Sequence, residues 1–197
     1  MKTFGHEELL SCYRRGVFPM SDGRDDPRVF LLDPNERGIV PLDSLHISRT
    51  MRKVMKRNDF EVTLNKAFHR VIALCAESAL DRPTTWISHD IEYLYAQLHA
   101  RGHAHSLEVW RDGDIIGALY GVSIGGAFFG ESMVSRATNG SKIALIKLVE
   151  HLNNRGFALL DTQFLTDHLV TMGAIEVSRG SYQRRLQKAL EIETSFI

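Results

Sequence analysis

The sequence predicts an α/β domain in which helices flank a mixed sheet. Residues 129–133 and 159–163 each read as an apolar strand that ends by presenting a carboxylate. One helix separates them, so the two strands are expected to run parallel, with Glu131 and Asp161 at neighbouring ends. Because α/β proteins usually bind and react at such strand ends, the pair predicts an enzyme.

The first part of the chain is expected to form a small subdomain over residues 1–62. It begins with a short helix around residues 7–15. The stretch over 16–41 holds four of the five prolines, and proline density of this kind predicts little regular structure. A basic helix follows that stretch.

The second part, residues 63–197, is expected to form the catalytic domain. The predicted elements are, in order, helices over 65–77 and 85–102, strands over 105–111, 115–123 and 127–132, a helix over 142–154 and a strand over 157–163. Asp112 and Gly113 predict a tight hairpin turn, so the first three strands are antiparallel. Two helices, three antiparallel strands, a helix and a parallel strand are the order of a GNAT-like (N-acyltransferase-type) domain.

Composition fits a globular protein with a buried core. Of the 197 residues, 44% are apolar and 24% are charged, which argues against disorder. No apolar run reaches the roughly 20 residues of a membrane span, and the first eight residues lack the apolar core of a signal peptide. The two cysteines are too few for a disulfide framework or a zinc site. We therefore expect a cytoplasmic protein.

The formal net charge is zero, so a nucleic-acid partner has to be bound by a local patch. Five cations recur at the spacing of one helical face, with Ser48 placed to cap the helix. They are Arg49, Arg52, Lys53, Lys56 and Arg57. Such a stripe, about 12 Å long, fits the phosphates of a nucleic-acid stem. The alternative is a solvated face whose cations pair with Asp59, Glu61 and other acids.

Other candidate sites are weaker. The loop over 135–141 leads into a helix N-terminus, which favours a phosphate such as the pyrophosphate of coenzyme A. Its glycine content is low, so a simple Asn or Ser cap is the alternative. His103 and His105 are two potential ligands without a third, so we expect no metal site. Trp86 begins a helix, where a partly exposed ring can stack on a base.

Nine segments occur in the order found in one known family. They are residues 13–19 (YRRGVFP), 44–49 (SLHISR), 85–87 (TWI), 102–110 (GHAHSLEVW), 119–122 (LYGV), 129–133 (FGESM), 141–142 (SK), 161–163 (DTQ) and 173–174 (GA). Over about residues 7–190 the chain resembles the leucyl/phenylalanyl-tRNA–protein transferases of the bacterial N-degron pathway. The resemblance implies transfer of Leu or Phe, and less readily Met, from tRNA to a protein N-terminal Lys or Arg. It also implies a GNAT-like domain, no coenzyme A, and a cytoplasmic monomer.

The resemblance assigns functional positions. Trp86, Glu131, Asp161 and Gln163 match functional residues of the family, and the basic stripe matches its contacts with the tRNA acceptor stem. Met20 stands where many members have tryptophan, and residues 31–32 are leucines where many have paired tryptophans. Those family residues help to hold the 3′ end of the aminoacyl-tRNA.

The reaction itself makes modest demands. The aminoacyl ester is already activated, so neither ATP nor a metal is required, and an α-amine of pKa about 7.7–8.0 is partly neutral at pH 7. Positioning should therefore supply most of the acceleration. We assign Gln163 to orienting the amine and Asp161 to polarising or anchoring it, because a neutral amide is too weak a base. Glu131 either accepts the proton or anchors the aminoacyl amine.

Selectivity for Leu and Phe requires an apolar slot. Its expected lining is Leu119, Phe128, Met133 and Leu152, with Gly130 leaving room. Met133 lets the slot adapt to a branched or a flat side chain. The alternative is that these side chains belong to the ordinary core.

Three functions compete at this point. The first is the aminoacyl-tRNA–protein transferase, with a close variant whose acceptors begin with Asp or Glu. The second is a coenzyme-A-dependent N-acetyltransferase, for which the basic stripe has no role. The third is an RNA-binding module, which leaves Glu131, Asp161 and Gln163 without a task.

Overall fold

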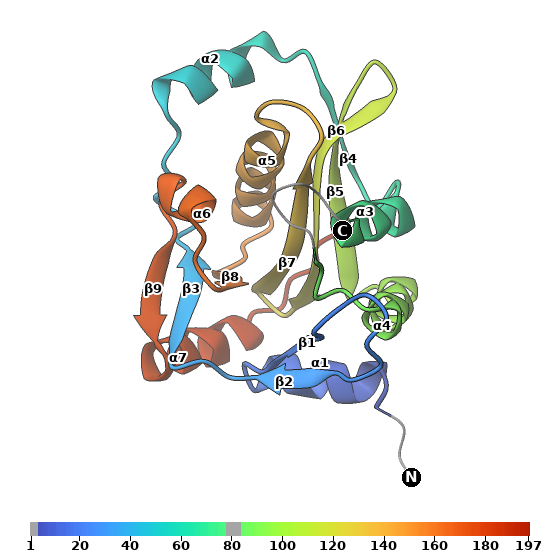
Figure 1. The fold of residues 1–197 in the computed structure, drawn as a ribbon. Helices are drawn as coiled ribbons and strands as arrows, with labels where there is room; N and C mark the ends of the chain where they lie inside the picture. Colours follow the sequence, from blue (N-terminus) through green and yellow to red (C-terminus); the bar gives the residue numbers. More distant parts are fainter. Residues whose placement is uncertain (1–3, 78–83) are drawn as a thin grey trace.

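The computed structural model describes residues 4–77 and 84–197, which form a sheet with helices on both faces (Figure 1). The strands are β1 Phe18–Met20, β2 Phe30–Leu32, β3 Glu36–Val40, β4 Glu61–Leu64, β5 Ala104–Arg111, β6 Asp114–Ile124, β7 Ala127–Ser135, β8 Leu159–Gln163 and β9 Ile175–Ser178. The helices are α1 His6–Arg14, α2 Arg49–Arg57, α3 Phe68–Ala76, α4 His89–Ala100, α5 Gly140–Asn154, α6 Asp167–Thr171 and α7 Arg179–Leu190.

The main sheet confirms the predicted order of elements. In the described residues it has seven strands in the order β4-β5-β6-β7-β8-β3-β9. The three strands β5, β6 and β7 are antiparallel, α5 crosses over, and β8 lies parallel to β7. Asp112 and Gly113 both have positive φ, 52° and 84°, as a hairpin turn that matches the strand twist requires. The predicted α/β class with a mixed sheet is therefore confirmed.

The parallel strands β7 and β8 separate after a short ladder. They pair only from Ala127 opposite Leu159 to Phe129 opposite Asp161. Beyond that point β7 continues along β6, while β8 pairs with β3. The two strands therefore diverge, and the carboxyl end of the pair opens.

A bulge lies on each side of this opening. On β7, Ser132 pairs with Tyr120 and Gly130 pairs with Gly121, so Glu131 is the extra residue. On β8, the register with β3 shifts in the same way at Thr162. Bulges re-aim side chains and are frequent beside active sites, and here they alter the side-chain alternation at the strand ends.

The core lies in two clusters, one on each face of the sheet. The first includes Leu9 and Tyr13 of α1, Tyr95 of α4 and Leu186 of α7. The second centres on α5 and includes Met51 of α2 and Phe196 near the carboxyl end. The α1 helix thus shares a core with α4 and α7, although they lie far apart in the sequence.

The prediction of little regular structure over residues 16–41 was wrong. Three strands form there: β1 pairs with β2, and β3 is inserted between β8 and β9 in the main sheet. Residues 36–40 contain no proline, and Ile39 and Val40 are buried, so nothing prevents this segment from pairing. The subdomain boundary at residue 62 stays a prediction, with the sheet and core running across it.

The sequence analysis predicted no element after residue 163. The structure has three more there. They are α6, β9 and α7. The α7 helix covers the face of the sheet that α1 also covers. In the described part of the chain, no helix has the length and the apolar character to cross a bilayer.

Candidate active site

A cavity of about 610 Å³ lies in the opening between β7 and β8. Six of the predicted site residues line it, namely Trp86, Leu119, Gly130, Glu131, Met133 and Gln163. The sequence analysis missed several further lining residues, among them Phe18, Pro19, Leu145, Leu148, Leu160 and Leu169. The splayed strands therefore bring residues from β1, β6, β7, α5, β8 and α6 to one space.

Phe128 and Leu152 do not line this cavity. Both side chains are fully buried in the second core cluster, and the Phe128 ring stacks on Phe196 with ring centres 5.1 Å apart. Leu145 and Leu148 of α5 line the cavity in their place. For these two positions, the structure agrees with the core interpretation.

The cavity has an apolar side and a polar side. The apolar side is formed by leucines of the second core cluster together with Met133. The polar side carries Glu131 and Gln163, behind which lie Tyr13 and Tyr95 of the first cluster. An apolar side chain and a polar reacting group can therefore be held next to each other.

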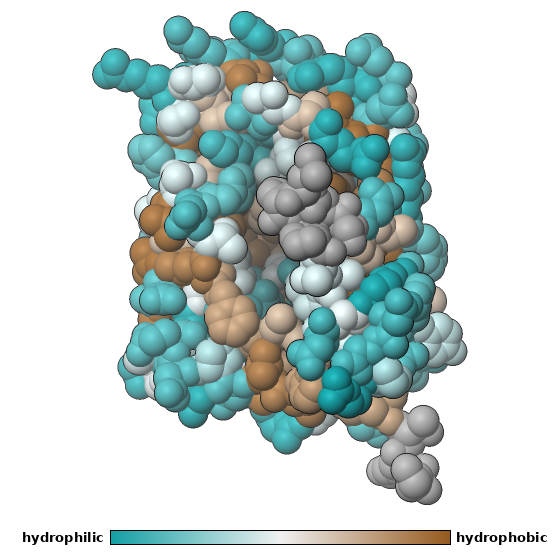
Figure 2. All heavy atoms as spheres, viewed as in Figure 1, coloured by the Kyte–Doolittle hydropathy of each residue, from teal (hydrophilic) through white to brown (hydrophobic). Residues whose placement is uncertain are grey.

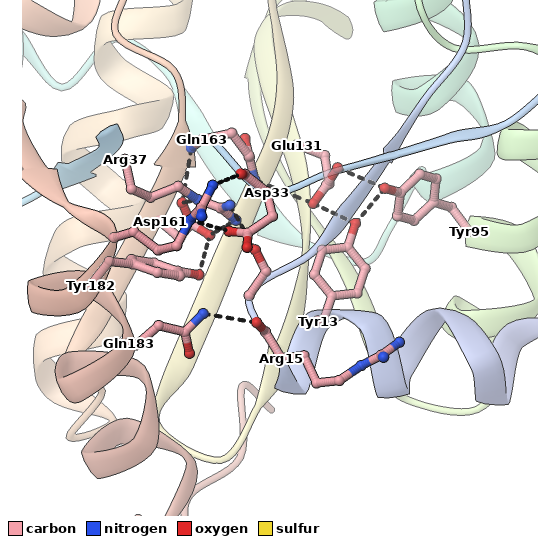
Figure 3. A network of polar contacts seen from close by, with 12 residues as sticks. Tyr13, Arg15, Asp33, Arg37, Tyr95, Glu131, Asp161, Gln163, Tyr182 and Gln183 are labelled. Atoms are coloured by element: carbon pink, nitrogen blue, oxygen red, sulfur yellow. Dashed lines mark hydrogen bonds and ion pairs between the residues drawn. The ribbon is translucent and has the colours of Figure 1, made fainter. Parts of the chain in front are cut away.

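Glu131 is bound by two buried phenols. The hydroxyl of Tyr13 donates to Oε1 at 2.7 Å and that of Tyr95 donates to Oε2 at 2.6 Å (Figure 3). Burial raises the pKa of Glu131 to about 7; the phenol hydrogen bonds and Arg37 oppose this rise, and the charge of Asp161 adds to it. A carboxyl group with this pKa can both give and take a proton near neutral pH.

Asp161 is fully buried and belongs to an ion pair. Arg37 Nε donates to Oδ1 at 2.9 Å and a terminal nitrogen of Arg37 donates to Oδ2 at 2.6 Å. The Tyr182 hydroxyl also donates to Oδ2, at 2.7 Å. The Arg37 guanidinium lies 4.5 Å from the ring centres of both Phe18 and Tyr182. Asp161 therefore lies behind the cavity wall, where its carboxyl group contacts other residues of the protein and does not line the cavity.

The pKa values around this pair follow from the same contacts. Burial by itself lowers the pKa of Arg37, but the hydrogen bonds and charge of Asp161 outweigh burial and raise it. Burial and the nearby Asp161 charge raise the pKa of Tyr182. Arg37 therefore keeps its positive charge, and Tyr182 keeps its proton.

Gln163 has a backbone conformation that is rare for residues other than glycine. Its φ is +58°, and its N–H donates to Oδ1 of Asp161 at 2.9 Å. The side-chain Nε2 lies 3.5 Å from Oε1 of Glu131. Asp161 thus holds the left-handed turn that points the Gln163 amide at Glu131, and strained residues of this kind cluster at functional sites.

Trp86 is held by the loop that follows β1. The N–H of Ser21 donates to the Trp86 carbonyl at 3.2 Å, and Arg24 donates to the carbonyl of Ile87 at 3.0 Å. Met20, at the end of β1, lines the same cavity as Trp86. Trp86 and Met20 therefore both lie on the cavity wall.

The basic stripe lies on α2, as predicted. Ser48 caps the helix by accepting from the N–H of Met51 at 3.2 Å, and Met51 is buried. The five cations are exposed, and hydrophilic residues cover this end of the molecule (Figure 2). Within residues 4–77 and 84–197 none of the five forms an ion pair. Asp59 and Glu61 pair instead with Arg111 and Lys66.

The N-terminus of α5 is packed closely against β6. A Cβ atom on Gly140 would lie 1.9 Å from the carbonyl oxygen of Ile116. The N–H of Gly140 donates to Ala137 and that of Ser141 to the hydroxyl of Ser135. Because these N–H groups are already bonded, this end does not offer the open cradle that a pyrophosphate needs.

Of the two histidines considered as metal ligands, His105 has other contacts. His105 contacts Asn65 at 3.0 Å and stacks on Phe196, and burial lowers the pKa of His105 to about 4. Among the residues that the structure describes, no three His, Cys, Asp or Glu side chains gather as a metal site would require.

Sequence comparisons point to one family. The family described as leucyl/phenylalanyl-tRNA protein transferase matches residues 39–187. A leucyl/phenylalanyl-tRNA–protein transferase of Maricaulis maris is 54% identical, over 100% of this chain and 91% of its own. One of Hyphomonas neptunium is 52% identical, over 98% of this chain and 75% of its own. The solved structure of L-PGS from Bacillus licheniformis is 15% identical, covers 83% of this chain and 55% of its own, and has a TM-score of 0.46.

Proposed function

The chain belongs to the leucyl/phenylalanyl-tRNA protein transferase family, and on that premise we propose the reaction that its cavity performs. The enzyme transfers Leu or Phe, and less readily Met, from aminoacyl-tRNA to the N-terminal Lys or Arg of a protein. The product is marked for degradation by the N-degron pathway. The enzyme acts as a cytoplasmic monomer.

One observation carries this proposal: the cavity joins an apolar compartment to Glu131 and Gln163. The donor side chain enters the compartment lined by Leu119, Met133 and the α5 leucines. Its ester carbonyl then lies at the level of the two polar residues, where the acceptor amine attacks. An unbranched, adaptable Met133 accommodates both a branched Leu and a flat Phe.

Gln163 orients the attacking amine. Its Nε2 is directed toward Glu131, which leaves the amide oxygen to accept a hydrogen bond from the amine. Asp161 supports this role from behind through the N–H of Gln163. We therefore assign Asp161 and Arg37 to positioning Gln163, and Glu131 to the proton that moves during transfer.

Residues of the first 62 positions supply most of the contacts with tRNA, and Trp86 adds one. The exposed cations of α2, which form no ion pair with the residues that the structure describes, suit the phosphates of an acceptor stem, since each contact displaces a counterion. Trp86 and Met20 bind the terminal adenosine between the stem and the ester, with the indole as the stacking surface. Residues 63–197 carry the reacting groups, which Arg37 supports from the first part of the chain.

A coenzyme-A-dependent acetyltransferase is not favoured. The N–H groups of Gly140 and Ser141 at the start of α5 are bonded within the protein, and Gly140 lies against the backbone of β6. The position that a pyrophosphate would need is therefore filled. An acetyltransferase also gives no task to the cations of α2.

The test is transfer of radiolabelled Leu from charged tRNA to peptides that begin with Arg, Lys, Asp or Ala. We expect label on the Arg and Lys peptides alone, and none after RNase treatment. Gln163→Ala should lower the rate strongly, whereas Gln187→Ala, an exposed glutamine on α7, should not. Label on the Asp peptide alone, or transfer that survives RNase, would contradict the proposal.

A further inference from the structure

Three oxygen-bearing side chains meet beside the cavity in a closed triangle. Tyr13 and Tyr95 each contact one oxygen of Glu131, at 2.7 Å and 2.6 Å. Their own hydroxyl oxygens are 2.5 Å apart. Figure 3 shows the three contacts as a ring between α1, α4 and β7.

Counting hydrogens gives the protonation state of this ring. Each contact at such distances needs one hydrogen between its two oxygens. The two phenols supply two hydrogens for three contacts. If Glu131 is ionised and accepts from both phenols, the contact between Tyr13 and Tyr95 has no hydrogen and two lone pairs face each other. A protonated Glu131 supplies the third hydrogen: the acid then donates to one phenol, that phenol donates to the other, and only the second phenol donates to Glu131, so every contact is satisfied.

The phenols are packed in apolar surroundings. Tyr13 and Tyr95 have no exposed surface; Tyr13 packs on Phe129 with ring centres 4.8 Å apart and Tyr95 on Tyr120 at 5.4 Å. Burial and the proximity of Glu131 raise the pKa of both phenols, so they keep their protons. An uncompensated polar contact in such surroundings is costly.

The charged neighbours also favour a neutral Glu131. The groups that act on it from the surrounding elements are Tyr13 on α1, Tyr95 on α4, Gln163 and Asp161 on β8, and Arg37 on β3; Tyr120 on β6 packs on Tyr95. The positive charge of Arg37 is already bonded to Asp161. No cation is therefore left to form an ion pair with Glu131 among the neighbours that the structure describes.

We propose that Glu131 is a neutral carboxylic acid in the substrate-free enzyme, because the contact between Tyr13 and Tyr95 prevents both phenols from donating to it at once, and that Glu131 gives its proton to the ribose oxygen as the ester is cleaved. The second half rests on the proposed function. The phenols are positioning residues: both can turn their hydrogens to the carboxylate that forms during the reaction.

The step balances. The amine nitrogen forms a bond with the ester carbonyl carbon, and the bond between that carbon and the ribose oxygen breaks. The Glu131 proton goes to the departing oxygen. The carboxylate left behind takes the proton that the new amide nitrogen loses. Glu131 is thus a neutral acid again, and no other acid or base is consumed.

The first test is infrared difference spectroscopy of the substrate-free protein at pH 6, wild type against Glu131→Gln. We expect the carbonyl band of a protonated carboxylic acid in the wild type, with a shift in D₂O, and its loss in the variant. Absence of this band from the difference spectrum would overturn the proposal, whatever the activity. The comparison needs no substrate, so it is independent of the transfer reaction.

The ring is tested by Tyr13→Phe and Tyr95→Phe, which keep the packing of the rings. Each variant should shift the acid band, because the acid loses one partner of the ring. A band at the wild-type frequency in both variants would contradict the hydrogen bonds between Glu131 and the two phenols. If one variant fails to fold, the other still gives this readout.

Single-turnover transfer tests the second half. Glu131→Gln should slow the chemical step by about 10²–10⁴-fold, and each phenylalanine variant by about tenfold, with the KM for aminoacyl-tRNA unchanged. Wild-type rates in Glu131→Gln would overturn the proton-donor role. If the wild type shows the acid band but transfers no amino acid, the proposed function is wrong, while the neutral acid in the ring is still supported.

Discussion

Arg37 and Asp161 form a buried ion pair across strands β3 and β8, with two hydrogen bonds of 2.9 Å and 2.6 Å. The two residues are 1% and 0% exposed at their side chains, and 124 positions separate them in the sequence. Their contact places the N–H of Gln163 against Asp161. The geometry of the site therefore depends on a strand from the beginning of the chain.

Removing one partner of this ion pair should destabilise the protein more than replacing both partners. Asp161→Leu should lower the free energy of unfolding by about 3–5 kcal/mol, because Arg37 stays buried without a counter-charge. Arg37→Met together with Asp161→Leu should lose clearly less, as measured by urea unfolding. Both should transfer slowly, because Gln163 loses the acceptor for its N–H. Losses that simply add in the double variant would contradict the coupling.

The cations of α2 should affect tRNA binding and leave turnover largely unchanged. Arg52→Ala with Lys53→Ala should weaken binding and reduce the slope of log K against log salt by about 1–2, because up to two phosphate contacts are lost. The rate at saturating tRNA should stay near the wild-type value. Arg184→Ala with Arg185→Ala, two exposed cations on α7, is the matched control. An equal loss of affinity in the control pair would remove α2 from the tRNA contact.

The pKa of Glu131 predicts a pH-dependent stability. Burial raises this pKa to about 7, so the folded state holds the proton more tightly than the unfolded state, where a Glu titrates near 4.3. The stabilisation is complete below about pH 4.3 and is lost as pH rises through about 7. Between pH 4.5 and pH 8, the free energy of unfolding of Glu131→Gln should therefore rise by about 2–3 kcal/mol relative to that of the wild type. The free energy of unfolding is measured with urea at each pH. The same pH dependence in the wild type and in Glu131→Gln would contradict the raised pKa.

The choice of donor should depend on Met133 and not on Phe128. Met133→Ala enlarges the apolar compartment and should change the ratio of Leu to Phe transfer by about 10-fold or more, within the range for small apolar contacts. Phe128→Leu should destabilise the fold through its lost contact with Phe196, with the ratio unchanged. Competition between the two charged tRNAs measures both variants. An altered ratio in Phe128→Leu would return that residue to the pocket.

Local patterns gave correct predictions where the physics is local. Helical spacing and a serine cap predicted α2, and two residues that adopt positive φ predicted the turn between β5 and β6. The crossover helix predicted that β7 and β8 are parallel, with Glu131 and Asp161 near each other. The prediction from proline density failed at β3. Residues 36–40 contain no proline, and this strand forms by pairing with β8, which is distant in the sequence.

The sequence by itself determined the order of elements over residues 65–163, the basic face of α2, and the presence of a carboxylate at the end of each of the two strands β7 and β8. Only the tertiary structure decided their roles. Arg37, Tyr13 and Tyr95 are buried polar residues brought to the site across long sequence separations, and no periodicity marks them. Likewise, the position of Glu131 depends on the bulge in β7, and the cavity depends on how far β7 and β8 diverge. Register and strand separation are set by packing over the whole sheet, so they cannot be read from any one segment.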